Sequence, residues 1–220
     1  MQALFVNEAL EANRYLYRGI HFSEDHPGID FSNLKLGTLL NLDNGNPRSY
    51  EKNNPRLQLI EIVKNAINPN IPNRSTCSYF SGDKDYAASY AWEEKKVKGW
   101  LTKLVDFEGS VWYNKNITDF LDNTPTVQFS MTDINPRVFG TIKEHVFDFD
   151  FIKKYQWPQS PVYGTPNYGS ELVKLIKWYA KYFNGLEQYH IGDKTFKCEY
   201  FLHGKHTIEI VGDYKRPNMY

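Results

Sequence analysis

The sequence predicts an α+β protein with mainly antiparallel strands. Two observations carry this prediction: the apolar segments are short, and helices and strands follow one another without the regular strand–helix alternation of a parallel sheet. The chain has 220 residues, with 41% hydrophobic and 16% aromatic residues, enough material for one packed core. We therefore expect a single domain over residues 1–220.

The first half of the chain alternates helices, strands and loops. Residues 23–57 are rich in Asn, Asp, Gly, Pro and Ser, so we expect a loop there with a short apolar piece at 36–42. Helical spacing of apolar residues and terminal charges predict helices at 2–12, 55–67 and 82–96. Alternating or β-forming residues predict strands at 14–20, 74–80, 100–107 and 110–113.

The second half ends in a helix and two strands. A helix over 170–183 is predicted to begin at Ser170, after a Pro-containing loop. Residues 194–204 and 205–214 are predicted to form an antiparallel pair joined at Gly204. The region between these halves is harder to interpret, with candidate strands at 124–131 and 145–152.

Charge and cysteine content narrow the class of protein. Lys plus Arg and Asp plus Glu both number 26, which argues against a protein held on nucleic acid by charge alone. Cys77 and Cys198 lack metal-site spacing, so we expect reduced thiols in a cytoplasmic protein, with one disulfide left open. Neither a secretory signal nor an apolar run of membrane-spanning length is evident, so we expect no membrane partner.

Three places carry residue types suited to chemistry on an anionic ligand. Arg18 stands in the short strand "RYLYRGI" beside Gly19, where a fork of donors meets an exposed backbone. Hydroxyl side chains gather in "RSTCS", 74–78, just before a predicted helix. Glu199 places a carboxylate inside the apolar stretch "FKCEYFLHG".

Each of these places also has an ordinary structural interpretation. Arg18 can be a solvated cation at a strand end, and the hydroxyls of 74–78 can cap the following turn or helix. Glu199 can be a surface residue paired with Lys197 or Lys205.

The order of these motifs resembles that of a known family. "YLYRGI", "STCSYFSGDKDYAASYA" followed by "WLTKLVDFEGSVWY", and "KCEYFLHG" are similar to the three successive motifs of ADP-ribosyltransferases of the arginine–serine–glutamate branch. The likeness is greatest to the small mono-ADP-ribosyltransferases of T-even-like bacteriophages, which act on host proteins. It covers about half of the chain and leaves residues 23–72 and 114–168 unmatched.

The resemblance implies two facing, mainly antiparallel sheets around an NAD cleft, and transfer of ADP-ribose from NAD with release of nicotinamide. It assigns Arg18 to the NAD phosphates, the backbone of Gly19 to the nicotinamide amide, and Ser75 to the ribose. Glu199 would face the oxocarbenium-like sugar, whose positive charge a carboxylate stabilises. No metal is expected. Further NAD contacts are expected from Thr76, Tyr79 and Phe80.

Two departures from the family pattern leave alternatives open. Lys197 stands two residues before Glu199, where Glu or Gln helps to choose the acceptor, so modification of arginine is in doubt. Cys77 stands where Ser is more usual; Ser81 could take the serine role, although Ser75, followed by Thr76, is preferred.

The family likeness also bounds the partners. We expect a monomer in the host bacterial cytoplasm with a host protein as acceptor, and RNA or DNA as the substitute. The alternatives are a binding protein or inhibitor without turnover on the same fold, and a toxin that hydrolyses NAD.

Overall fold

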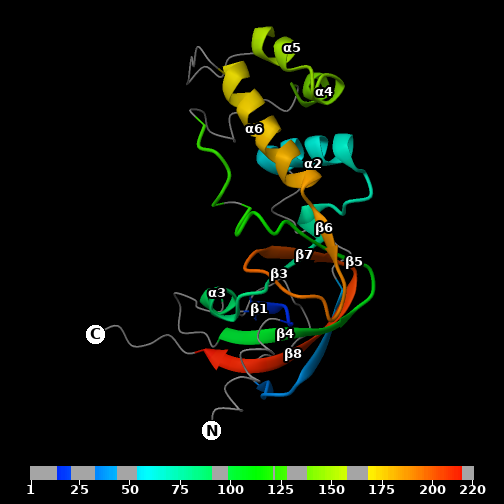
Figure 1. The fold of residues 1–220 in the computed structure, drawn as a ribbon, viewed down its shortest axis with the longest axis vertical. Helices are drawn as coiled ribbons and strands as arrows, with labels where there is room; N and C mark the ends of the chain where they lie inside the picture. The colour runs from blue at the N-terminus through cyan, green and yellow to red at the C-terminus, as the bar shows by residue number, and fades with distance from the viewer. Residues whose placement is uncertain are drawn as a thin grey trace, which may run out of the picture. The chain divides into compact units, whose positions relative to one another are not determined.

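The protein forms two compact units. The computed structural model describes residues 14–20, 33–43, 54–90, 99–120, 122–127, 138–157 and 168–214. The sheet unit comprises residues 1–46, 77–118 and 187–220, and the helical unit comprises 47–76 and 119–186. Where the length of the chain predicts one domain over 1–220, the contacts divide it in two, and the chain passes between the units four times (Figure 1).

The sheet unit contains one antiparallel sheet of eight strands, which confirms the α+β class. The strands are β1 Tyr17–Ile20, β2 Leu39–Asp43, β3 Ser78–Ser81, β4 Gly99–Phe107, β5 Ser110–Tyr113, β6 Glu187–Tyr189, β7 Glu199–His203 and β8 Lys205–Tyr214. Their order is β2-β8-β4-β1-β3-β7-β5-β6. The structure thus has one continuous sheet where the resemblance implies two facing sheets. The apolar piece predicted inside the first loop is strand β2.

Two glycine corners redirect strands within this sheet. Gly109 links β4 to β5 and Gly204 links β7 to β8, with φ of +120° and +114°. A Cβ on Gly204 would lie 2.2 Å from the Glu108 carbonyl oxygen, so the two corners pack against each other. The prediction that 194–204 pairs with 205–214 is therefore wrong: β7 pairs with β3 and β5, and β8 with β2 and β4. A single glycine turns the chain but is too short for the two-residue loop of a hairpin.

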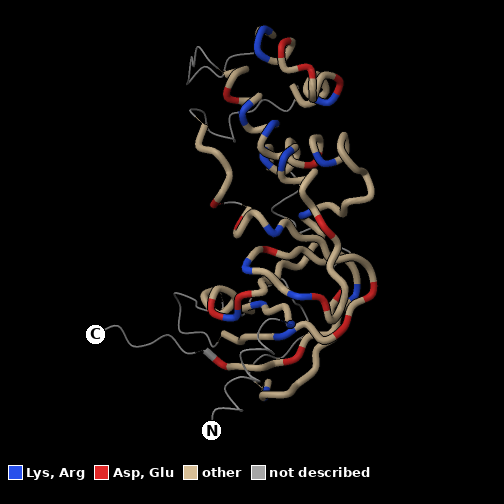
Figure 2. Tube along the Cα trace, viewed as in Figure 1, with Lys and Arg blue, Asp and Glu red and all other residues tan. Residues whose placement is uncertain are grey.

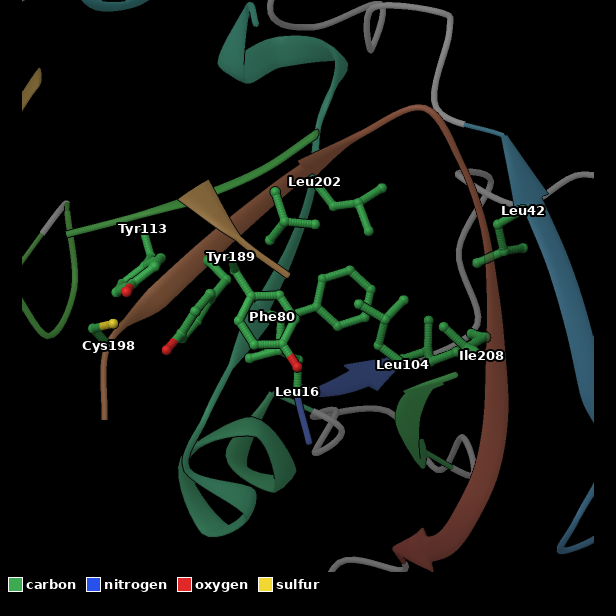
Figure 3. Packing of buried hydrophobic residues seen from close by; sticks show 12 residues of the cluster. Leu16, Leu42, Phe80, Leu104, Tyr113, Tyr189, Cys198, Leu202 and Ile208 are labelled. Carbon is green, nitrogen blue, oxygen red and sulfur yellow. The ribbon is translucent and has the colours of Figure 1, made fainter. Parts of the chain in front are cut away.

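The core of the sheet unit is shared by strands from both ends of the sheet (Figure 3). Leu42 of the edge strand β2 and Tyr189 of the opposite edge strand β6 belong to one buried cluster, together with Phe80 and Tyr200 of the middle strands. The sheet therefore curves around this core. On its other face, Ala87 and Ala88 of helix α3 (Lys84–Ser89) pack with Tyr17 and Leu101. Helix α3 accounts for the first part of the helix predicted at 82–96, and 91–98 lie outside the described residues.

The helical unit is built around two amphipathic helices. Helices α2 (Pro55–Ile67) and α6 (Tyr168–Asn184) pack together, and α6 begins two residues before the predicted Ser170. The predicted start of α2 at Pro55 is confirmed. Asn54 caps the helix there, because its side chain accepts hydrogen bonds from Arg56 N and Leu57 N. The remaining elements are the 3₁₀ helix η3 (Arg74–Thr76), α4 (Val138–Glu144) and α5 (Phe149–Lys154).

One strand prediction in the helical unit is wrong. Residues 145–152 alternate Phe and Asp like a strand, but the Asp148 carboxylate accepts a hydrogen bond from Phe151 N at 3.0 Å and caps α5. Residues 124–127 have no regular structure, and the rest of the candidate strand 124–131 lies outside the described residues, as does the helix predicted at 2–12. No helix in the described part of the chain is long and apolar enough to cross a membrane.

Candidate functional site

Three segments that are far apart in the sequence form consecutive strands of the sheet. Strand β3 lies between β1 and β7, so the strands with Arg18 and Glu199 flank the strand that begins at Ser78. Tyr17 is opposite Ser81, and Ser81 is opposite Glu199. The first residue of β1, the last of β3 and the first of β7 thus form one row across the sheet.

Arg18 is held at the junction of β1 and β3. Its guanidinium Nη1 donates a hydrogen bond to Ser78 Oγ, and its carbonyl oxygen accepts one from Thr102 Oγ1 on β4 at 2.9 Å. Ser78 is 1% exposed, whereas Arg18 is half-buried. Arg18 lies between Leu16 and Ile20, both core residues, so its cation faces the core side of β1. The bond to Ser78 links β1 to β3.

The structure places the predicted serine elsewhere. Ser75 and Thr76 lie in η3 of the helical unit, where Ser75 Oγ donates to Asn73 Oδ1 at 2.7 Å and Thr76 Oγ1 donates to the Asn73 carbonyl at 2.8 Å. The strand predicted at 74–80 therefore begins only at Ser78, and Ser78 is the hydroxyl that meets Arg18. The missed signal is Asn73 after Pro72, which caps a turn and delays the strand.

Alternation along β3 sorts the remaining candidates onto two faces. Phe80 is buried in the core cluster, edge-on to His206, so the prediction that it contacts NAD is corrected by its burial. Tyr79 is half-buried and lies on the other face, with Ser81 and Glu199. Glu199 is half-buried and begins β7. Arg18 and Glu199 are therefore close along the sheet but on opposite faces of it.

The turn after β3 interlocks with the segment before β7. A Cβ on Gly82 would lie 2.2 Å from the Phe196 carbonyl oxygen, so only glycine lets these backbones come so close. Asp83 N donates to Ser81 Oγ, while the Asp83 carboxylate caps α3 and forms an ion pair with Lys197 Nζ at 2.8 Å. This interlock fixes the chain just before Glu199.

The ion pair with Asp83 gives Lys197 a structural role. The hydrogen bond from Lys197 lowers the pKa of Asp83, and Asp83 in turn raises the pKa of Lys197. Lys197 therefore stays charged at neutral pH and is bound to the cap of α3, although its side chain is 70% exposed. Its observed role is to join two turns.

A buried aromatic cluster surrounds the residue before Glu199. Cys198 is 1% exposed, and burial raises the pKa of its thiol to about 12. The ring of Tyr113 stacks on Tyr200 and on Phe196. Burial, together with a hydrogen bond to Glu187, raises the pKa of Tyr113 to about 12. The residues on either side of Glu199 are therefore held in a buried, apolar cluster.

Metal ligands do not gather in the described residues: no group of three His, Cys, Asp or Glu side chains there could hold an ion. A pocket of about 270 Å³ lies between β2, β4 and β8, and none of its lining residues belongs to β1, β3 or β7. Cys77 and Cys198 are both buried free thiols.

Comparison of the chain with protein-family models, curated proteins and solved structures gives no match.

Proposed function

We propose that the sheet unit binds NAD and transfers ADP-ribose to a macromolecular acceptor, with release of nicotinamide. One observation carries the proposal: the three motif segments form the neighbouring strands β1, β3 and β7, with Arg18 bonded to Ser78 and Glu199 opposite Ser81. Sequence order alone does not require this adjacency, because β7 is more than a hundred residues from β3. A dinucleotide substrate needs such convergence, since it must touch several groups at once.

In this proposal Glu199 is the catalytic residue. Departure of nicotinamide leaves positive charge on the ribose, and a fixed carboxylate stabilises that charge. Glu199 suits this task because the interlock at Gly82 and the Asp83–Lys197 pair hold the preceding chain in place. Ser81, opposite Glu199 on the same face, takes the ribose-positioning role first given to Ser75.

Arg18 acts beside this centre. A guanidinium presents its donors in a planar fork, which suits a pyrophosphate. Arg18 and Glu199 lie on opposite faces, and Arg18 bonds Ser78 at the start of β3 while Glu199 is opposite Ser81 at its end, so Arg18 would have to leave Ser78 and turn toward Ser81 for NAD to contact both. Gly19 and Tyr79 would border the bound NAD.

The acceptor in this proposal is a protein of a bacterial host cell. Lys197 cannot accept a hydrogen bond while it is charged, so it cannot receive an arginine side chain as a Glu would. We therefore propose an acceptor group other than arginine.

Glu199→Gln tests the proposal most directly, because it keeps the size of the side chain and removes its charge. Transfer of labelled ADP-ribose to bacterial lysate should fall by roughly 10²-fold or more, while NAD affinity stays close to that of the unchanged protein. Glu187→Gln is the matched control: Glu187 accepts a hydrogen bond from Tyr113 at the end of β5 and pairs with Lys115 in the turn that follows, and the variant should leave transfer unchanged. Equal transfer by the Glu199→Gln and unchanged proteins would exclude Glu199 as the catalytic carboxylate.

The same assay separates the alternatives. Nicotinamide release without labelling of the lysate would identify an NAD hydrolase, and the absence of both reactions would favour a binding protein without turnover. Arg18→Lys keeps the positive charge but loses the fork. It should weaken NAD binding, and unchanged NAD affinity together with a lower melting temperature would reduce Arg18 to a link between β1 and β3.

A further inference from the structure

The net charge of zero hides an uneven distribution between the two units. The helical unit holds 12 Lys and Arg against 9 Asp and Glu, whereas the sheet unit holds 14 against 17. Figure 2 shows Lys and Arg along α6 and at α5 of the helical unit. The neutral composition of the whole chain therefore does not weigh against binding of nucleic acid by the helical unit.

The solvent face of α6 carries a row of lysines. Lys174, Lys177 and Lys181 are all exposed, and their spacing of three and four residues places them on one side of the helix. The opposite side, with Leu172, Ile176 and Tyr179 among others, is buried. At 1.5 Å per residue the row extends over about 10 Å, a length over which one strand of B-form DNA carries about three phosphates.

Two further lysines lie at the end of α5, next to the start of α6. A Cβ on Gly169 would lie 2.5 Å from the Ile152 carbonyl oxygen and 3.0 Å from that of Lys153, so the start of α6 lies against the end of α5. Lys153 and Lys154 are exposed there. We call Lys153, Lys154, Lys174, Lys177 and Lys181 the lysine face.

Neighbouring contacts neutralise this face in part, through the Lys174–Glu171 ion pair. Lys174 donates to the Thr126 carbonyl at 2.8 Å and lies 4.0 Å from Glu171, and Lys177 lies over the ring of Phe149 at 4.8 Å. A carbonyl and a ring leave the positive charge in place, and each ammonium has three donors. Like charges three or four residues apart on a helix repel one another. A polyanion on this face would remove that repulsion.

We propose that the lysine face binds the phosphate backbone of nucleic acid. Nucleic acid fits better than a lipid surface, because the apolar side of α6 is buried and unavailable for insertion. Tyr155, which follows Lys154 and is 38% exposed, offers a ring for a base to stack on. This inference concerns the helical unit and does not depend on the transferase proposal.

The proposal is tested on the full chain with three fluorescent probes: a 20-nucleotide RNA, the DNA strand of the same sequence and a DNA duplex. Fluorescence anisotropy measures the affinity for each probe between 50 and 200 mM NaCl. The variant Lys174→Gln/Lys177→Gln/Lys181→Gln keeps helix propensity and removes three charges. Its affinity for single strands should fall at least about tenfold and its salt slope should decrease by about 2, since each single-strand contact contributes about 0.7.

A second triple variant, Lys35→Gln/Lys194→Gln/Lys205→Gln, removes three exposed charges from the sheet unit and is the matched control. This control variant should bind each nucleic acid with the affinity of the unchanged protein. The probe that the unchanged protein binds most tightly, RNA, single-stranded DNA or duplex, is the form of nucleic acid that the lysine face prefers. No binding at 50 mM NaCl, or equal losses in both variants, would overturn the proposal. Lysine-dependent binding of polyglutamate but not of oligonucleotides would also overturn it and indicate an acidic protein partner.

Discussion

At the scale of single residues, Cys198 offers a test of how tightly the support of Glu199 is packed. Burial raises the pKa of Cys198 to about 12, and Cys77 is buried as well. A thiol reagent at pH 8 should therefore leave both cysteines unmodified in the native protein and modify both in denaturant. Labelling of Cys198 in a Cys77→Ser variant at the rate of an exposed thiol would contradict this packing.

The same thiol gives a pH dependence with a definite sign. A group whose pKa is higher in the folded than in the unfolded state stabilises the fold fully below its unfolded pKa, here about 9. That contribution is lost as the pH rises from about 9 through about 12. Denaturation at alkaline pH should therefore begin at lower pH in the unchanged protein than in a Cys198→Ala variant, if the two are first matched in stability at pH 7.

At the scale of elements, the interlock between the β3–α3 turn and the segment before β7 depends on Gly82. Gly82→Ala would place a methyl group 2.2 Å from a backbone oxygen, and such overpacking costs about 1–3 kcal/mol. We expect a lower melting temperature and, on the proposed function, slower transfer. Gly140→Ala is the control: its Cβ meets nothing within 4 Å in helix α4, so it should leave stability unchanged or raise it. Equal melting temperatures for both variants would show that the close contact at Gly82 does not contribute to the stability of the fold.

Local signals predicted elements well where they were unambiguous. Pro55 and the apolar spacing gave the bounds of α2, and alternation gave β4 and β5. The separate partners of β7 and β8 were not predictable, because a contact between the corners at Gly109 and Gly204 directs the two strands apart. At the site, the strands of Arg18 and Glu199 were predicted, but Ser78 was missed because the capping of η3 by Asn73 moved the start of β3.

At the scale of the whole molecule, the two units carry opposite net charge. The helical unit has three more basic than acidic residues, and the sheet unit has three more acidic than basic ones. The total is zero, with an isoelectric point near 7.0, so neither repulsion nor a uniform field keeps molecules apart at neutral pH. Opposite charges on different copies can then attract one another.

We therefore expect weak self-attraction that depends on salt and pH. Static light scattering at pH 7 and 20 mM NaCl should give a negative second virial coefficient, which should rise towards positive values in 300 mM NaCl as the charges are screened. Moving the pH away from the isoelectric point near 7.0 should also relieve it, because every molecule then carries net charge of one sign. The triple Lys→Gln variant of α6 loses the positive row and should show weaker attraction at pH 7. A virial coefficient that is the same at both salt concentrations would mean that the charge separation does not govern how copies of the chain meet.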